Sequence, residues 1–145
     1  MNEVAEPARG VGQVTVRVTE EHHIWQAQRA AKSLARSLAL PQVATYSIAT
    51  SVSELASNLF FHATCGGTIT LAVLRQDGRV GVEVVAEDEG PGILDIELAM
   101  QDGFTTNRGL GGGLPGVERL MDEFEISSSP GTGTRVVARK WEPCR

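Results

Sequence analysis

Two strand-like runs joined by an Asp-Gly pair constrain this chain more than any other feature of its sequence. Residues 68–74 and 80–87 are rich in apolar and β-branched side chains, and Asp77-Gly78 lies between them. An Asp-Gly pair in that position is a strong signal for a tight hairpin turn, which joins antiparallel neighbours. The chain therefore contains a β-hairpin, and a doubly wound sheet of alternating strands and helices is disfavoured.

Periodicity and turn signals predict further segments on both sides of this hairpin. They are strands at 13–18, 125–128 and 134–141, and helices at 20–40, 42–63, 94–100 and 114–124. After the first strand, the strands come in neighbouring pairs, and the helices are grouped before each pair. This order predicts an α+β fold, a two-layer sandwich of helices on a mixed, mainly antiparallel sheet.

The length of 145 residues suits one compact domain. We expect residues 1–12, which are polar and mildly acidic, to be a disordered lead-in to a single domain over residues 13–145. The formal net charge of −5 disfavours non-specific nucleic-acid binding. There is no signal-peptide pattern, no run approaching the roughly 20 apolar residues of a membrane span, and no cysteine framework. We therefore expect a cytoplasmic protein that binds neither nucleic acid nor membrane.

The helix predicted over 42–63 carries two parallel stripes. One stripe is apolar (Ile48, Val52, Leu55, Leu59), and the other, offset by one residue, is polar (Ser47, Ser51, Glu54, Asn58, His62). Glu54 and Asn58 are four residues apart, which places their Cβ atoms ~5–6 Å apart on one face. Their oxygens could share a water or a hard cation such as Mg²⁺. A solvated helix face would carry the same residues, and spacing alone leaves both interpretations open.

Glycine is concentrated in one segment, since eight of the 16 glycines lie within residues 88–116. Asp88 ends a predicted strand and precedes Gly90 and Gly92. A carboxylate there could accept a hydrogen bond from an exocyclic amine such as that of adenine, and glycine allows close backbone approach. A tight turn with an acidic rim is the alternative. Residues 109–116 open a helix, where backbone N–H groups and the helix dipole favour phosphate.

Two familiar phosphate-binding loops do not fit this segment. A P-loop needs a lysine before Ser or Thr, and no lysine lies between Lys32 and Lys140. A dinucleotide-binding G-x-G-x-x-G spacing is present within residues 111–116, but no predicted strand leads into it. His62 and Cys65 could ligate zinc, although two ligands do not make a structural zinc site.

The motifs are most informative in their order along the chain. Glu54-x-x-x-Asn58 on a helix, D-x-G-x-G-I after a strand, G-L-G-x-G-L opening a helix, and G-T-G-T before the last strand resemble the ATP-binding site of the GHKL superfamily, the Bergerat fold. The segments 53–56, 87–93, 102–106 and 114–124 are similar to the RsbT-type switch serine/threonine kinases of the bacterial stressosome, relatives of the anti-sigma factor kinases.

This resemblance implies an ATP-dependent protein serine/threonine kinase with ATP and Mg²⁺ as cofactors. Asn58 would hold Mg²⁺, and Glu54 would orient or deprotonate the incoming serine hydroxyl. Asp88 would bind the adenine amine, supported by Thr134 through water. The resemblance also implies nucleotide contacts from Gly90, Gly92, Ile93, Thr105, Arg108, Gly109, Leu110, Gly111, Gly112, Gly113 and Leu114.

The partners implied by the resemblance are STAS-domain antagonist and stressosome scaffold proteins, which are the substrates. The released kinase, a monomer or weak homodimer, would then bind and activate a PP2C-type phosphatase. Two alternatives are a nucleotide-binding partner-switch module and an anti-sigma factor, each without significant kinase turnover. Glu54 favours the kinase, because a pure binding module has no use for a carboxylate one turn before the Mg²⁺ asparagine.

Overall fold

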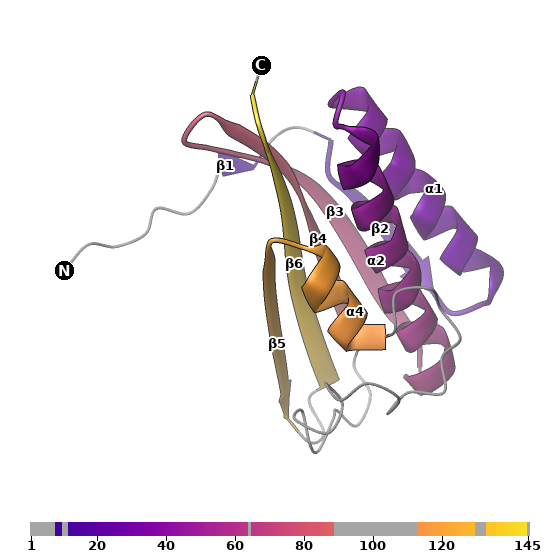
Figure 1. Ribbon diagram of the computed structural model, residues 1–145. Helices are drawn as coiled ribbons and strands as arrows, with labels where there is room; N and C mark the ends of the chain where they lie inside the picture. Colours follow the sequence, from indigo (N-terminus) through magenta and orange to yellow (C-terminus); the bar gives the residue numbers. More distant parts are fainter. Residues whose placement is uncertain (1–7, 10–11, 64, 89–112, 130–132, 145) are drawn as a thin grey trace.

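The computed structural model describes residues 8–9, 12–63, 65–88, 113–129 and 133–144, which form helices packed on one sheet (Figure 1). The elements are β1 (Ala8–Arg9), β2 (Val14–Val18), α1 (His22–Ser37), α2 (Gln42–His62), β3 (Gly67–Gln76), β4 (Arg79–Asp88), α4 (Gly113–Leu120), β5 (Glu123–Ser129) and β6 (Gly133–Pro143). Among the described helices, none has the length and apolar character needed to cross a membrane. The helix expected at 94–100 lies outside the described residues.

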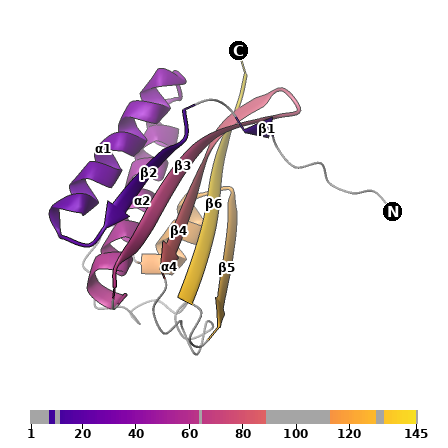
Figure 2. The same ribbon diagram turned by 180° about the vertical axis from the view of Figure 1, so that it is seen from behind.

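The sheet has six strands in the order β1-β3-β4-β6-β5, with β2 paired to β3 beside β1. Each described strand pair is antiparallel. The described helices cover one face of the sheet (Figure 1). In the view from behind, the strands lie in front of the helices (Figure 2). The predicted two-layer α+β sandwich is therefore confirmed.

The hairpin between β3 and β4 forms where the Asp-Gly pair predicts it. Asp77 and Gly78 have positive φ angles of 52° and 74°, and Gln76 pairs with Arg79 directly across the turn. Positive φ at both central residues is the requirement of the turn that matches the twist of two antiparallel strands. The ten-residue pairing that follows makes β3 and β4 the centre of the sheet.

The two long helices match the predictions to within three residues at each end. The C-terminus of α1 is closed by Ala39, which has a φ of 54° and donates its N–H to the Arg36 carbonyl at 2.9 Å. The N–H of Leu40 bonds the Ala35 carbonyl at 3.1 Å. These two bonds form a Schellman motif, which ends the helix before α2 begins after Pro41.

The predicted helix over 114–124 is too long, because α4 ends at Leu120 and β5 begins at Glu123. The side chain of Asp122 explains this boundary: its Oδ2 accepts the backbone N–H of Trp141 at 2.7 Å. Asp122 also donates its own N–H to the Arg139 carbonyl at 2.9 Å. Residue 122 is thus hydrogen-bonded to β6, and the chain turns into the sheet four residues earlier than its apolar spacing indicates.

The expected disorder of residues 1–12 does not extend to Ala8 and Arg9, which form the short strand β1. They pair antiparallel with Arg75 and Leu74. Strand β2 pairs with β3 only from Gly67 to Leu71. On this edge, the backbone N–H and C=O groups of β3 beyond Leu71 are therefore not bonded to β2. Unpaired N–H and C=O groups at a sheet edge are a ready template for another segment.

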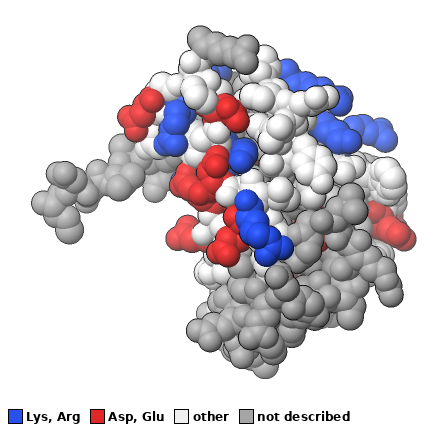
Figure 3. Space-filling model, in the orientation of Figure 1, with Lys and Arg blue, Asp and Glu red and all other residues white. Residues whose placement is uncertain are grey.

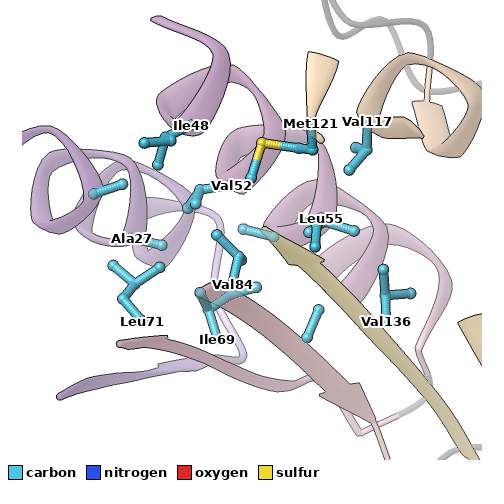
Figure 4. Packing of buried hydrophobic residues seen from close by; sticks show 14 of the residues in the cluster. Ala27, Ile48, Val52, Leu55, Ile69, Leu71, Val84, Val117, Met121 and Val136 are labelled. Atoms are coloured by element: carbon cyan, nitrogen blue, oxygen red, sulfur yellow. The ribbon is translucent and has the colours of Figure 1, made fainter. Parts of the chain in front are cut away.

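The core lies between the sheet and the helices (Figure 4). The predicted apolar stripe of α2 is confirmed, since its four members are 5% exposed or less (Ile48, Val52, Leu55, Leu59). Helix α1 contributes alanines that are completely buried (Ala27, Ala31, Ala35). Small side chains of this kind allow two neighbouring helices to approach closely. Helix α2 is consequently held on several sides, which fixes the direction of its polar residues.

A candidate nucleotide-binding site

The polar row of α2 is buried rather than solvated. Ser47, Ser51 and Glu54 are 4%, 0% and 2% exposed, respectively. Glutamate is almost never fully buried in a protein unless it has a partner. The interpretation of this row as an ordinary solvent-facing stripe is therefore wrong for these three residues, and Glu54 needs a structural or chemical reason for its position.

Glu54 contacts the glycine-rich start of α4. Its Oε2 accepts a hydrogen bond from the backbone N–H of Gly113 at 3.2 Å, across 59 residues of sequence. Gly113 has a φ of 74°, a conformation that side chains rarely allow, and the residue is buried. This N–H was expected to bind a phosphate, and in the structure it binds a carboxylate oxygen. The contact places Glu54 beside the helix start predicted to bind anions.

Asn58 lies one helical turn beyond Glu54, and its buried Oδ1 has no hydrogen-bond partner within the described part of the chain. Leaving such an oxygen unpaired costs about 1–3 kcal/mol. A hard cation would provide the missing interaction, since Mg²⁺ prefers oxygen ligands and commonly takes only one or two from protein. The donor set of Asn58 and the neighbouring Glu54 carboxylate therefore fits Mg²⁺ bound together with phosphate.

Asp88 and Thr134 lie at the same end of the sheet as Asn58. They occupy the next position beyond the antiparallel register pair Glu87–Arg135. Each lies two residues from a core residue, Ala86 or Val136, so both lie on the helix-covered face. Asp88 pairs across β3 with Gly67. A Cβ at Gly67 would lie 2.7 Å from a methyl carbon of Leu59, the residue after Asn58. The absence of a side chain there lets α2 approach the strand end that carries Asp88.

The hydroxyl of Thr134 has a partner that the sequence analysis missed. Its Oγ1 lies 2.9 Å from the Oγ of Ser128, its register partner on β5. Thr134 itself is 9% exposed. The signal for this pair is the short turn between the two last strands, which sets Ser128 opposite Thr134 once the hairpin register is known. Ser128 thus fixes the orientation of the hydroxyl that the resemblance places near the base.

Six of the predicted site residues are described, and five of them come together at this end of the molecule through α2, α4 and the ends of β4 and β6 (Glu54, Asn58, Asp88, Gly113, Thr134). The sixth, Leu114, follows Gly113, but its side chain is buried in the hydrophobic core, so it anchors α4. The other predicted contacts lie outside the described residues: Gly90, Gly92, Ile93, Thr105, Arg108, Gly109, Leu110, Gly111 and Gly112.

A histidine pair elsewhere has a structural role. Among the described residues, Glu20, His22 and His23 bring potential metal-ligating atoms within 4.8 Å of one another. However, the Nδ1 of His23 accepts the backbone N–H groups of Thr19 and Glu20, each at 3.1 Å. That acceptor role leaves the ring proton on the other nitrogen, so the same ring is not free to bind metal. We interpret His23 as a side chain that fixes the backbone leading into α1, whose N-cap residue is Glu21.

A cavity of about 530 Å³ lies away from these residues. The turn between α1 and α2 forms one wall, and Arg75, Val80 and the end of β6 form the rest. None of the predicted site residues lines it. The site end of the molecule is therefore identified by its polar side chains and not by this cavity.

Comparison with known proteins agrees with the motif order. The profile of the family described as "Histidine kinase-like ATPase domain" matches residues 16–140. The chain is 43% identical over 129 residues to the serine/threonine-protein kinase RsbT of Bacillus subtilis, covering 89% of this chain and 96% of that protein. It is 40% identical over 99 residues to an anti-sigma F factor of Caldanaerobacter subterraneus, covering 65% and 68% of the two chains.

Solved structures share the fold at low sequence identity. The RsbU and RsbW domains of a Mycobacterium tuberculosis protein superpose with a TM-score of 0.60 and 18% identity, covering 93% of this chain and 34% of that one. A mycobacterial sensor histidine kinase, MprB, has a TM-score of 0.53 and 16% identity, covering 91% and 98%. The chain belongs to the histidine kinase-like ATPase family, in its RsbT-like serine/threonine-kinase branch, and is related to the anti-sigma F factors.

Proposed function

We propose that the protein transfers the γ-phosphoryl group of ATP to serine or threonine residues of STAS-domain proteins. The observation that carries this proposal is the position of Glu54. It is a buried carboxylate of α2 that accepts a hydrogen bond from the first residue of α4. It lies one turn before Asn58, whose amide oxygen has no partner in the ranges that the structure describes. A protein that only binds nucleotide gains nothing from a buried anion beside the phosphates, whereas a kinase needs a proton acceptor there.

Phosphoryl transfer asks the protein mainly for positioning and charge stabilisation. In the proposed step, the serine hydroxyl oxygen forms a bond to the γ-phosphorus while the bond to the β–γ bridging oxygen breaks. Glu54 orients the hydroxyl and accepts its proton, and ADP leaves with the bridging oxygen. Asn58 would hold Mg²⁺, which when bound neutralises charge on the phosphate oxygens. Its amide oxygen suits this role because no described residue donates a hydrogen bond to it.

Asp88 would select the base. It lies at the end of β4 on the helix-covered face, half-buried between the registers of Gly67 and Thr134. A carboxylate accepts hydrogen bonds and has none to donate. It therefore binds an exocyclic amine and disfavours a carbonyl at the same ring position. The hydroxyl pair of Thr134 and Ser128 supplies a further polar group beside it.

The proposed substrates are a small STAS-domain antagonist and larger STAS-domain scaffold subunits, in the cytoplasm. Phosphorylation adds roughly −1.5 to −2 charges to the interface between kinase and substrate. Because this chain is already acidic, with a net charge of −5, the added charge would weaken the complex and release the kinase. The released kinase would then bind and activate a PP2C-type phosphatase.

The test is transfer of label from γ-phosphate-labelled ATP to the purified STAS-domain proteins encoded with this chain. We expect labelled serine or threonine that depends on Mg²⁺. Measurable ATP binding with no transfer to any STAS protein would contradict the proposal and favour a nucleotide-binding partner-switch module. The similarity to anti-sigma F factors makes sigma-subunit binding the second candidate, which a pull-down with purified sigma subunits tests directly.

A further inference from the structure

A stripe of four residues runs along the exposed side of α1. Trp25, Arg29, Lys32 and Arg36 follow one another at steps of four, three and four residues, so they share one helix face. We call them the α1 stripe. The stripe spans about 16 Å along the helix axis. The core-facing alanines Ala27, Ala31 and Ala35 lie on another face and are completely buried.

The cations of the α1 stripe are not paired with carboxylates in the part of the chain that the structure describes. Among the described residues, Arg29, Lys32 and Arg36 take part in no ion pair, whereas Arg135, Arg139 and Lys140 of β6 each have a carboxylate within 4.0 Å. Basic side chains gather over α1 in the space-filling view (Figure 3). A local positive surface on a chain with a net charge of −5 is therefore available to an acidic partner.

Trp25 gives this surface an apolar anchor. It is 66% exposed, the most exposed aromatic side chain among the described residues. Tryptophan and arginine are the residues most enriched where protein interfaces gain their binding energy, and they act together when an apolar side chain fills a recess ringed by charge. The first turn of α1 therefore offers the anchor, and the following turns offer the charges.

The α1 stripe is on the opposite flank from the proposed transfer site. Helix α2 lies between α1 and α4, and Glu54 is bonded to the first residue of α4 (Figure 1). The Glu54 carboxylate therefore lies on the side of α2 that faces α4. A partner bound to the outer face of α1 leaves this contact between Glu54 and α4 uncovered.

We propose that the α1 stripe binds an acidic helix of a partner protein that this chain does not phosphorylate. The 4-3-4 spacing is that of a helix–helix seam, so the occupant is a helix with Asp or Glu opposite the cations and an apolar recess for Trp25. A membrane or nucleic acid fits less well, because the stripe has one aromatic residue and the molecule is acidic. The identity of the non-substrate partner rests on the proposed function, which names a PP2C-type phosphatase.

The probe is the purified full-length PP2C-type phosphatase encoded with this chain, titrated calorimetrically against wild-type protein and two double variants. Arg29→Glu with Arg36→Glu reverses the stripe, and Arg17→Glu with Arg75→Glu is the matched control. Both control arginines are exposed and lack ion pairs among the described residues. Each double reversal changes the charge by −4, from −5 to −9. We expect the dissociation constant to rise at least tenfold for the stripe variant and less than twofold for the control.

Trp25→Ala, which leaves all charges in place, is expected to weaken the same complex at least fivefold. Phosphorylation of the STAS proteins is measured on every variant and is expected to stay at the wild-type rate. Equal weakening by both double variants, or no phosphatase binding by the wild type, overturns the inference. Loss of STAS phosphorylation with intact phosphatase binding also overturns it, because the stripe would then bind substrate.

Vesicles containing anionic lipid and duplex DNA serve as further probes, and wild-type binding to either through the stripe overturns the inference. The two proposals fail separately. If no STAS protein is labelled while reversal of the stripe still removes phosphatase binding, the kinase proposal is wrong and the stripe assignment stands. If labelling occurs while the stripe variants bind the phosphatase as tightly as wild type, only the stripe assignment is wrong.

Discussion

At the scale of single residues, the candidate site depends on two side chains that are costly to bury. Glu54 is 2% exposed, and the amide oxygen of Asn58 has no hydrogen-bond donor among the described residues. Burying an unpaired amide oxygen, or a carboxylate even when Gly113 donates to it, costs free energy that an apolar side chain of similar size would not. Groups that cost stability and remain at a helix start suited to anions are the ones expected to act on a ligand.

Glu54→Ala is expected to reduce phosphoryl transfer to a STAS protein by at least a hundredfold while ATP affinity stays within threefold of wild type. The reason is that Glu54 acts on the hydroxyl, and general acid–base groups contribute roughly 10²–10⁴-fold in rate. Labelling rate and calorimetric ATP binding are measured on the same preparation. Glu118→Ala, an exposed glutamate on α4, is the control. Transfer at the wild-type rate in Glu54→Ala would show that the assigned role is wrong.

Asn58→Ala is expected to lower the affinity for Mg²⁺-ATP without lowering the unfolding free energy of the protein. Removing an unpaired buried oxygen leaves the unfolding free energy of the nucleotide-free protein unchanged or raises it by about 1 kcal/mol. The affinity for Mg²⁺-ATP is expected to fall at least tenfold, and Asp88→Asn is expected to weaken it as well. Denaturant unfolding and calorimetric titration check the two parts. A variant that binds Mg²⁺-ATP as tightly as wild type would exclude Asn58 as the metal ligand.

At the scale of elements, the face of the sheet opposite the helices is held by an ion-pair network between β4, β5 and β6. Glu83 and Arg139 are register partners with an N–O distance of 2.9 Å, and their side chains are 4% and 20% exposed. Desolvation lowers the pKa of Arg139, but the hydrogen bond and charge of Glu83, with Glu123, outweigh it and raise the pKa above its usual value. The Arg139 guanidinium therefore stays charged at all ordinary pH values.

Arg139→Met is expected to lower the unfolding free energy by roughly 3 kcal/mol, because it removes the cation from a buried carboxylate. Arg135→Met provides a control on the same strand. Arg135 and Glu87 are 3.9 Å apart and each is 52% exposed, so the expected loss is below about 1 kcal/mol. Urea unfolding of both variants checks the difference. Similar losses in the two variants would contradict the importance of burial.

At the scale of the whole molecule, the site joins elements that are distant in sequence. Helix α2, the start of α4 and the ends of β4 and β6 meet at one end of the sheet. A nucleotide bound there contacts the native arrangement and not the unfolded chain. Nucleotide binding should therefore stabilise the whole fold by mass action.

ADP at a hundred times its dissociation constant, with Mg²⁺, is expected to stabilise the protein by about 2.7 kcal/mol. For a chain of this size that corresponds to a rise in melting temperature on the order of 10 °C. Differential scanning calorimetry checks the shift. Addition of EDTA is expected to remove most of it, and Asn58→Ala should show little shift with or without the chelator. An EDTA-insensitive shift of full size would contradict a Mg²⁺ role in binding.

The elements of this protein could be predicted because their signals are local. The Asp77-Gly78 turn and the period of α2 each depend on residues within a few positions of one another, and both predictions are confirmed. The end of α4 was predicted wrongly because Asp122 is hydrogen-bonded to Trp141, which lies 19 residues away. The pairing of Ala8 and Arg9 with β3 was not predicted, because their partners Arg75 and Leu74 lie more than 60 residues away.

By itself, the sequence determined the order of the strands and helices, the hairpin register at the turn, and the candidate residues Glu54, Asn58 and Asp88. Only the tertiary structure decided that Ser47, Ser51 and Glu54 of α2 are buried, that Glu54 contacts Gly113, and that the cations of the α1 stripe form no ion pair with another described residue. Periodicity identifies a face of a helix but not what covers it. That depends on packing between segments far apart in the chain, where burial and hydrogen bonding are set together.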